Sequence, residues 1–504
     1  MHPREPRVNQ TARLNRRVLP ILAALSLVLV ALAPGPQATS DGWASVGEGV
    51  EYKEFHLPGP NWVYVARMDR HNPNVTLDTM IAQAPGADQR ETVSVLAARH
   101  DQAINSWNGT WGTRNQVVVA INGSFHDRES GVSYGGAIHA GWIGPWSGDW
   151  TSPLNVGWTM DRDLVLGSCT WLPPEAQVLT YLAAGQTQPI GGLNVSAQDN
   201  QLVVLTPEFT SHTPGGPYAT EVLVEMARPA FIIPTPRMAR GIIREIRDGM
   251  DPTTIPFNYV VLVANGAARA ALLQNARVGA SVGISLEIRE LGTRCENPTG
   301  TDWSKAYAAL SGGFVFLRDG EVFHDYGAFS VADHPRTAIA FNEEYIYFVV
   351  VDGRNEEWSL GMTLDELALF CQERLGARSA ISMDGGGSST MWLNGRVMNH
   401  PSDGNERRVA DGLMMVVVEP MAQSTAFRPG DRVSAHNAVE VRLGPGSNYG
   451  VQTTLPAGSE GVIARQIARI GGVLARGSYW WEVAFERGTG WVTEGSLTLL
   501  PPVP

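Results

Sequence analysis

The sequence predicts a mixed α/β or α+β domain with a mixed β-sheet core, followed by a small all-β domain. Three observations support this prediction. Short apolar runs typical of strands recur between Trp43 and Glu419. Two segments repeat their apolar residues at helical spacing. Glycine and proline are abundant, with 54 and 32 of 504 residues, and they divide the chain into many short elements.

The first 40 residues are predicted to be an export signal. Five arginines precede an apolar run from residue 18 to 33, and Ala31-Leu32-Ala33 has the small-x-small form of a cleavage site. The run is short for a full membrane span, but an uncleaved N-terminal anchor stays open as an alternative. In both cases we expect the rest of the chain to work outside the cytoplasm, secreted or at the cell surface.

Residues 43–420 are predicted to form one domain, because no linker longer than a loop interrupts them. Apolar runs at residues 62–66, 117–121 and 345–351 predict strands, and another at 379–383 ends at a glycine-rich turn. The stretch from about 160 to 300 is less regular. It fits either an insertion or half of a larger sheet.

Two helices are predicted within this domain. The first covers residues 91–105, where Val95, Leu96 and Ile104 are spaced for one face. The second follows Thr363, which begins a capping box with a glutamate three residues later. Gly376 is expected to end this second helix. Strand, helix, strand and glycine-rich turn then alternate, which indicates a mixed α/β core.

The composition changes near residues 422–429, and short strands separated by turns follow to the end of the chain. Residues 428–504 are therefore predicted to form a separate small β-barrel. Their motifs resemble bacterial SH3-like domains: VRLGPGS at 441–447, Trp481 with its strand, and GWV at 490–492. The resemblance implies a non-catalytic module that contacts peptidoglycan or another cell-wall partner.

Charge and cysteine content narrow the choice of partners. The net charge of −12 opposes binding to nucleic acid or to an anionic membrane. The three cysteines are Cys169, Cys295 and Cys371, and no CxxC or Cys/His cluster indicates structural zinc. One disulfide and one free thiol would suit an exported protein, but the pairing stays open. Cys371 lies in the second predicted helix and is expected to be a buried apolar residue.

The strongest chemical motif follows the strand at 379–383. Asp384 is followed by Gly385, Gly386 and Gly387, and then by the hydroxyl residues Ser388, Ser389 and Thr390. Three glycines cost backbone entropy, which is reasonable where the backbone must approach a ligand and expose N–H groups to an anion. No lysine follows the glycines, so a Walker A loop is disfavoured. The simpler alternative is a sharp structural turn.

Four further motifs place polar groups at predicted strand ends. They are His334-Pro335-Arg336, Asp352-Gly353-Arg354, Asn122-Gly123-Ser124-Phe125 and Glu406-Arg407. Together they predict a pocket with two or three arginines and several carboxylates. Arginine would hold a phosphate and stabilise its charge as it leaves. Carboxylates would stabilise an oxocarbenium-like centre or activate water. Such a pocket suits hydrolysis at an anomeric carbon next to a phosphate.

The order of these motifs resembles the phosphodiester glycosidase family, which includes the lysosomal uncovering enzyme, N-acetylglucosamine-1-phosphodiester alpha-N-acetylglucosaminidase. The resemblance extends over roughly residues 90–420 and is strongest after 305. Its elements are residues 122–125, 311–314, 334–338, 352–354, 361–368, 383–390 and 406–409. It implies an exported hydrolase that cleaves a sugar from a sugar-1-phosphodiester, in cell-envelope or extracellular glycan. In the family a second aromatic residue often follows the first element. His126 stands at that position, which implies an altered sugar pocket or an added acid/base group.

Motifs and resemblance together assign a role to each candidate residue. The predicted catalytic residues are Asp384, Arg336, Asp352 and His334. The predicted substrate-binding residues are Asn122, Gly123, Phe125, Arg354, Gly385, Gly386, Gly387, Ser388, Ser389, Thr390, Glu406 and Arg407.

Two other functions compete with this hypothesis. The first is a non-catalytic cell-wall-binding protein built on a degenerate glycosidase domain; the retained Asp384, Arg336 and Asp352 argue against it. The second is a metal-dependent phosphodiesterase, which is disfavoured because histidines and carboxylates do not cluster at ligand spacing. No cofactor is expected, although a single structural Ca²⁺ stays open. The sugar, its partner across the phosphate, the stereochemical outcome and the oligomeric state also stay open.

Overall fold

The computed structural model describes 14 stretches of the chain. They are residues 42–83, 90–107, 110–111, 114–129, 131–144, 146–147, 154–167, 170–207, 210–228, 238–249, 252–290, 302–303, 306–323 and 331–501. The predicted export signal lies outside them, and so do Cys169 and Cys295, so the signal and the disulfide pairing stay predictions. Within the described residues no helix is long and apolar enough to cross a membrane.

Two sheets packed face to face form the part of the fold that carries most of the predicted site. The first sheet has eight strands in the order β1 (Ala44–Gly47), β2 (Val50–Leu57), β3 (Asn61–Asp69), β27 (Tyr345–Val351), β26 (Arg336–Phe341), β28 (Ser379–Ser382), β24 (Val315–Arg318) and β25 (Glu321–Val322). The second has five, in the order β30 (Arg396–Val397), β29 (Met391–Leu393), β7 (Arg114–Asn122), β31 (Asp411–Glu419) and β4 (Val75–Ile81). Their facing side chains bury one shared core, which includes Phe348 and Ile381 from the first sheet and Ile121 and Met415 from the second.

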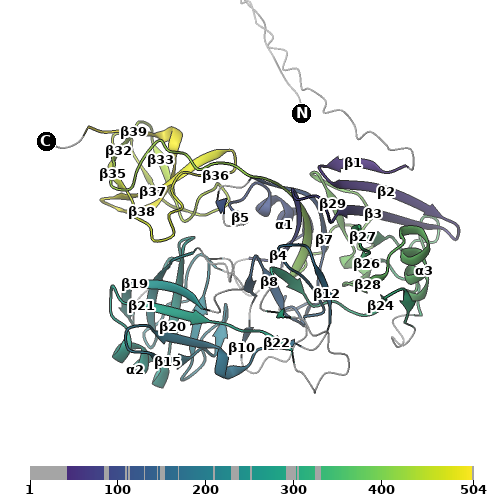
Figure 1. Ribbon diagram of the computed structural model, residues 1–504, viewed down its shortest axis with the longest axis horizontal. Coiled ribbons are helices and arrows are strands. Elements are labelled where there is room, and N and C mark those ends of the chain that lie inside the picture. Colours follow the sequence, from purple (N-terminus) through teal and green to yellow (C-terminus); the bar gives the residue numbers. More distant parts are fainter. Residues whose placement is uncertain are drawn as a thin grey trace, which may run out of the picture. The chain divides into compact units, whose positions relative to one another are not determined.

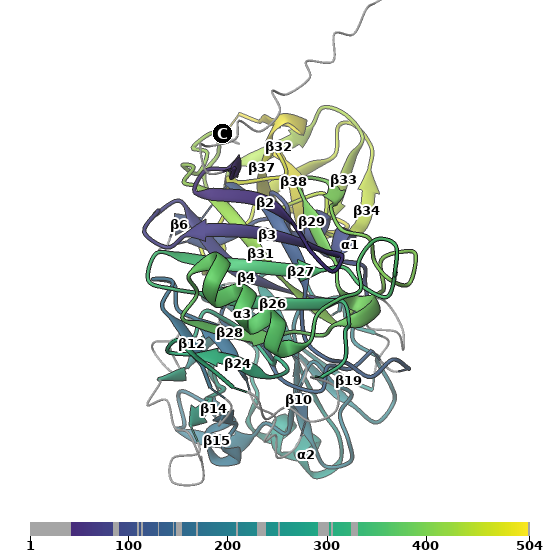
Figure 2. The same cartoon turned by 90° about the vertical axis from the view of Figure 1, so that its right-hand side faces the viewer.

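A helix covers the other face of the eight-stranded sheet. This helix, α3 (Leu364–Leu375), lies across β26, β27 and β28 (Figures 1 and 2). Its apolar side buries Leu367, Phe370 and Cys371 against Val349 and neighbouring residues of the sheet. Cys371 is buried, as the sequence predicted. It is also free, and burial raises the pKa of its thiol.

The predicted ends of α3 are confirmed. The side chain of Thr363 accepts a hydrogen bond from the Glu366 backbone, and the Glu366 carboxylate accepts one from the Thr363 backbone. Gly376 ends the helix in the left-handed conformation, with φ of 64°. Helix α3 connects β27 to β28, and these two strands are parallel to each other. Strand β26 lies between them and is antiparallel to both.

The first predicted helix is shorter than expected. We predicted residues 91–105, whereas α1 spans Val93–His100 with Thr92 as its N-cap. The chain leaves the helix at Asp101, because the next residues bind the edge of β7. The Asp101 carboxylate accepts a hydrogen bond from the Val117 backbone, and the Gln102 backbone donates one to the Asn115 carbonyl. Tertiary pairing therefore ends the helix before the apolar pattern does.

The less regular middle of the sequence forms a sheet of its own. Its nine strands have the order β10 (Trp146–Ser147), β16 (Gly192–Leu193), β17 (Leu202–Leu205), β20 (Tyr259–Ala264), β18 (Thr220–Met226), β19 (Ala239–Asp248), β21 (Ser281–Ser285), β14 (Val178–Tyr181) and β15 (Gln186–Pro189). Helix α2 (Gly266–Asn275) packs against it. The sheet is mixed, because β16 and β17 pair in parallel. It has a separate core, so this region is not half of the sheet that carries the site.

Three small sheets complete the region before residue 420. One has the order β12 (Leu164–Leu166), β11 (Val156–Trp158), β23 (Ala308–Leu310), β8 (Ala137–His139) and β9 (Trp142–Ile143). The two pairs are β5 (Ser106–Trp107) with β6 (Thr110–Trp111), and β13 (Thr170–Trp171) with β22 (Arg289–Glu290). The predicted many short strands and a mixed sheet are therefore present. Strands dominate the fold and the described residues contain only three α-helices, so the α+β or mixed α/β class stays a prediction.

The C-terminal residues form an antiparallel sheet with its own core. Its order is β34 (Val451–Leu455), β33 (Val439–Arg442), β38 (Gly488–Thr493), β37 (Ser478–Phe485), β35 (Glu460–Ile463), β32 (Arg432–Ala435) and β39 (Leu497–Leu499), with β36 (Val473–Ala475) beside β37. A second cluster joins Trp480 and Trp491 to Ile104 and Phe257 from earlier in the chain. This sheet is therefore packed onto the rest of the chain. The SH3-like barrel stays a prediction.

Candidate functional site

The predicted site residues gather because several strand ends meet at one edge of the two packed sheets. Gly412 of β31 pairs with Asn122 at the end of β7. In the other sheet, Arg336 at the start of β26 pairs with Val351 at the end of β27. The Met383 backbone continues the neighbouring strand pair with a hydrogen bond of 2.7 Å to the Thr337 carbonyl. The loops that follow these strand ends in the two sheets therefore lie side by side.

Backbone hydrogen bonds fix the glycine loop, residues 384–388, between the two sheets. The Asp384 N–H donates to the Gly123 carbonyl at 2.9 Å, and the Gly386 N–H donates to the Pro335 carbonyl at 2.9 Å. The Asn122 side-chain amide donates to the Asp384 carbonyl at 2.6 Å. Three of the predicted motifs are therefore joined directly.

Asn122 is the centre of this junction. Its side chain is fully buried, and its Oδ1 accepts hydrogen bonds from the Thr337 hydroxyl at 2.8 Å and the Thr390 backbone at 3.1 Å. Ser389 and Thr390 are buried as well. We predicted substrate contact for Asn122, Ser389 and Thr390. The structure places all three beneath the loop, where they hold it in shape.

Two guanidinium groups lie against consecutive glycines of the loop. A Cβ at Gly386 would lie 2.8 Å from Nη2 of Arg354, and one at Gly387 would overlap Nη2 of Arg407. Gly386 has a φ of 60°, which other residues rarely adopt. Glycine is therefore required for a reason that the sequence alone did not show. It lets two arginine side chains approach the backbone directly behind Asp384.

A chain of polar contacts connects Arg407 to Asp384. Asp403 accepts hydrogen bonds from Nε and Nη2 of Arg407, at 2.8 and 2.6 Å. Nη1 of Arg407 donates to the Ser388 hydroxyl at 3.2 Å, and that hydroxyl donates to Oδ2 of Asp384 at 2.5 Å. The Asp403 carboxylate holds the Arg407 guanidinium in place. Contacts with Asp403 and Ser388 do not use all of its N–H groups, so the others can bind a ligand.

His126 forms the other side of Asp384. Its Nδ1 lies 3.8 Å from Oδ2 of Asp384, and its side chain is only 2% exposed. Its Nε2 is buried and has no hydrogen-bond partner in the described part of the chain. Burial raises the pKa of Asp384, and Ser388, His126 and Arg407 oppose that rise. Burial lowers the pKa of His126, while the nearby carboxyl opposes this. The two groups therefore titrate closer together than they would in water.

Asp411 supports the same junction and was not singled out by its sequence. Its Oδ1 accepts a hydrogen bond of 2.6 Å from the Ser124 backbone, and its carbonyl accepts one from the Gly123 N–H. A Cβ at Gly123 would overlap this carboxyl group. Burial raises the pKa of Asp411 to about 6, and the Asp384 carboxyl adds to the rise.

This raised pKa predicts a loss of stability as the pH increases. The folded chain keeps the Asp411 proton up to about pH 6, whereas the unfolded chain releases it near pH 4. The folded state therefore binds more protons in that interval, and the free energy of unfolding should fall by about 3 kcal/mol across it. We expect Asp411→Asn, which retains an acceptor for Ser124, to remove this part of the slope. Urea unfolding of both proteins between about pH 4 and 7 measures it, and equal slopes would contradict the assignment.

Arg336 and His334 lie in a second group beside the loop. Nε of Arg336 donates to the Met362 carbonyl at 2.7 Å, and Nη2 donates to the Ala332 carbonyl at 2.8 Å. Burial lowers the pKa of Arg336 to about 10, with the charge of Arg354 contributing, so it stays protonated at neutral pH. Burial also lowers the pKa of His334, with contributions from both arginines. The predicted phosphate ligand Arg336 thus has much of its fork bound to the backbone.

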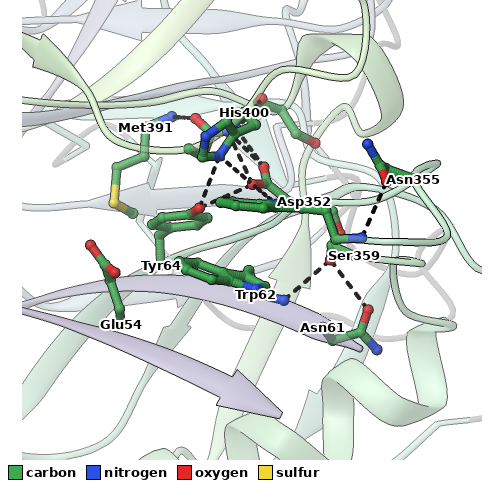
Figure 3. Close-up of polar contacts among 12 residues, drawn as sticks. Glu54, Asn61, Trp62, Tyr64, Asp352, Asn355, Ser359, Met391 and His400 are labelled. Carbon is green, nitrogen blue, oxygen red and sulfur yellow. Dashed lines mark hydrogen bonds and ion pairs between the residues drawn. The ribbon is translucent and has the colours of Figure 1, made fainter. Parts of the chain in front are cut away.

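Asp352 is the centre of a third group, shown in Figure 3. The side chain is 1% exposed. Its Oδ2 accepts hydrogen bonds from the Tyr64 hydroxyl at 3.0 Å and the Trp358 indole at 3.1 Å, and lies 3.2 Å from Nδ1 of His400. Its Oδ1 accepts one from the Asn399 amide at 3.0 Å. A carboxylate with so many donors is suited to positioning its neighbours. We predicted a catalytic role for Asp352, and these contacts favour a supporting one.

Glu406 binds the start of helix α1. Its two carboxylate oxygens accept hydrogen bonds from the backbone and hydroxyl of Ser94, at 2.9 and 2.5 Å, in the first turn of α1. This satisfies a free N–H group at the helix start. Phe125, in contrast, is 36% exposed and lies close to Gly313, so it can contact a ligand.

Several site residues were missed because only the fold brings them to the loop. Asp403, Asp411 and His400 follow no motif that indicates chemistry. The only available signal was the spacing of Asp403 four residues before Arg407. Within the described residues, no three histidine, cysteine or acidic side chains form a group that could hold a metal ion.

Comparison with known proteins gives the family of this region. Residues 247–416 match the family model of phosphodiester glycosidase. This region is a phosphodiester glycosidase domain. The match contains the glycine loop with Arg354, Asp403 and Arg407, and it is narrower than the 90–420 expected from the motifs. Asn122 and His126 lie before it, and the structure brings them to the matched region.

Individual relatives of the phosphodiester glycosidase domain are distant. The SPbeta prophage-derived protein YomE of Bacillus subtilis (strain 168) is 40% identical over 95 residues, which are 19% of this chain and 14% of YomE. A hypothetical protein from Synechocystis has a TM-score of 0.48 at 17% identity, covering 75% of this chain and 63% of its own. The zebrafish N-acetylglucosamine-1-phosphodiester alpha-N-acetylglucosaminidase catalytic domain, auto-inhibited by its pro-peptide, has a TM-score of 0.33 at 14% identity, covering 77% and 87%.

Proposed function

We propose that this protein hydrolyses the bond between a sugar and the phosphate of a sugar-1-phosphodiester. One observation carries the proposal: Arg354 and Arg407 lie against consecutive glycines of a loop that begins at the half-buried carboxyl group of Asp384. An anion site and a carboxyl group are therefore adjacent, as this reaction requires. The phosphodiester glycosidase match over residues 247–416 supports the same activity.

Arg354 and Arg407 are the proposed phosphate ligands. Arg354 is exposed, and within the described residues its guanidinium makes one weak hydrogen bond, 3.5 Å from Nη1 to the Ser402 hydroxyl. Its φ of 63° is unusual for a residue other than glycine and holds the side chain beside Gly386. Guanidinium forks match phosphate oxygens and would stabilise the phosphate as it departs.

Asp384 is the proposed carboxylate at the anomeric carbon. In its ionised form it would stabilise positive charge on the sugar ring or take a proton from the attacking water. The carbon–oxygen bond to phosphate breaks, water supplies the new hydroxyl of the sugar, and the other product is a phosphomonoester. Phosphate leaves as a weak base, so the site needs no strong general acid. His126, buried beside Asp384, is placed to exchange a proton with it.

A substrate screen tests this activity. We expect the purified protein to release a reducing sugar and a phosphomonoester from sugar-1-phosphodiesters, and to leave aryl glycosides without phosphate largely intact. A sugar phosphate as product would indicate ordinary phosphodiesterase action. Water labelled with heavy oxygen identifies the bond that breaks, because attack at the anomeric carbon places the label in the sugar, whereas attack at phosphorus places it in the phosphate. A panel in which only aryl glycosides are cleaved would overturn the phosphate-binding role of the two arginines.

The location of the reaction is a separate proposal. The arginine-rich, apolar N-terminus supports export, and the motifs of residues 428–504 support contact with peptidoglycan or another wall polymer. The proposed substrate is then a phosphodiester-linked glycan of the cell envelope or its surroundings. The non-catalytic alternative predicts wall binding without turnover, so the same screen separates the two.

A further inference from the structure

A cavity lies apart from the glycine loop. Its volume is about 250 Å³, and no residue of 384–388 lines it. Strands β4, β7, β8 and β31 contribute to its lining. Three further parts of the chain surround it: the end of α1 with Arg99 and His100, the segment around Ser211, and the C-terminal turn around Asn448. Because pockets for drug-sized ligands measure about 300–1,000 Å³, this one suits a ligand of roughly one sugar ring.

Four side chains of the cavity lining have polar atoms without a hydrogen-bond partner in the described part of the chain. They are Nε of Arg99, Nε2 of His100, Oδ1 of Asn115 and Oδ1 of Asn448, and all are buried. Asn115 is only 5% exposed, and its amide nitrogen donates to the Ala103 carbonyl, which leaves the oxygen as the unmatched acceptor. Buried polar atoms without partners are costly, and so many in one cavity indicate a ligand with matching groups.

The polar groups behind the cavity are connected to one another. The Tyr307 hydroxyl donates to Oδ2 of Asp78 at 3.3 Å, and Oδ1 of Asp78 lies 3.3 Å from Nδ1 of His139. The His139 ring meets the His100 ring edge to face, with centroids 4.8 Å apart. Burial lowers the pKa of His100 well below its usual range, with His139 and Arg99 contributing, so its ring is neutral at physiological pH.

The charges of the cavity argue against an anionic ligand. The Arg99 guanidinium is already paired with Glu91, at 2.7 Å, and donates to the Ile81 carbonyl. Asp78 adds a buried carboxyl group, whereas a phosphate would need an unpaired cation. The unmatched atoms include both a donor and acceptors. Hydroxyl groups, which donate and accept, satisfy such a set best.

We propose that this cavity binds a neutral sugar unit, separately from the site at Asp384. The binding would join the end of α1, the 210–211 segment and the C-terminal turn through a single ligand. It does not depend on the proposed hydrolysis, because none of its residues belongs to the glycine loop.

Calorimetric titration of the full chain with methyl glucoside, methyl galactoside and N-acetylglucosamine tests this proposal, with glucose 1-phosphate as the charged comparator. We expect at least one neutral sugar to bind more tightly than glucose 1-phosphate. Asn448→Ala removes one unmatched acceptor and should weaken that binding about tenfold. Asn437→Ala, the same change at an exposed bend between β32 and β33, should leave it unchanged. Absence of any sugar binding up to about 10 mM would overturn the proposal.

Two further variants separate this cavity from the hydrolytic site. Ser211→Trp places a large side chain at the exposed mouth of the cavity and should abolish sugar binding with little effect on folding. Asp384→Asn should leave the binding constant unchanged. Binding that is lost in Asp384→Asn but retained in Ser211→Trp would assign the sugar to the glycine loop and overturn the proposal. A crystal soaked in the bound sugar should show it beside Asn115; ordered water alone in that position would also overturn it.

Discussion

Replacing Asp384 by asparagine is expected to lower kcat/KM for a sugar phosphodiester at least about a hundredfold. Asparagine has nearly the same shape and still accepts the hydrogen bond from Ser388, so the glycine loop should persist. It lacks the negative charge that the anomeric centre needs. Because burial raises the pKa of Asp384, its charge is costly in the folded protein, and its removal should not lower the melting temperature.

The matched control is Asp161→Asn, the same change at an exposed position away from the loop. It should leave both turnover and melting temperature unchanged. Steady-state kinetics and thermal unfolding on the same preparations provide both readings. If Asp384→Asn stays folded and keeps a rate within about threefold of the wild type, the carboxyl group does not act in the reaction and the site is misplaced.

The second large effect is expected from Arg407→Lys. Lysine keeps the positive charge but loses the planar fork that contacts Asp403 and Ser388 together. Its single ammonium group cannot both pair with Asp403 and hold a phosphate. We expect kcat to fall about a hundredfold on a phosphodiester, because the lost contact is made chiefly with the departing phosphate. Turnover with a range of leaving groups measures this, and the loss should be greatest for the poorest one.

Arg336→Lys should behave differently from Arg407→Lys. The Arg336 fork donates to the carbonyls of Met362 and Ala332, so its loss should lower the melting temperature and reduce activity mainly through the folded fraction. Arg396→Lys, at an exposed strand residue, serves as the control without effect. A specific loss of kcat in Arg336→Lys at an unchanged melting temperature would return the phosphate-binding role to Arg336, as the sequence first indicated.

The sequence was most informative where a local rule decides the structure. The capping box at Thr363 and the left-handed Gly376 fixed both ends of α3, because caps depend on residues within one turn of each other. The strand at 345–351 was predicted residue for residue, since a continuous β-branched and aromatic run fits a buried strand. Helix α1 was predicted too long, because the pairing of residue 102 with β7 lies outside any local pattern.

The glycine motif shows both what the sequence could predict and what only the tertiary structure decided. The sequence by itself identified Asp384, the three glycines and the arginines of the flanking motifs, because hydrolysis next to a phosphate needs those groups and few structural turns do. It could not assign the partners of each side chain. Only the packing of the two sheets decided that Arg354 and Arg407 reach the loop, that Arg336 binds backbone carbonyls, and that Glu406 caps α1. It also brought His126 beside Asp384 and Ser124 beside Asp411. These contacts join residues hundreds of positions apart, so they depend on how strands from two sheets meet, and no spacing along the chain records that geometry.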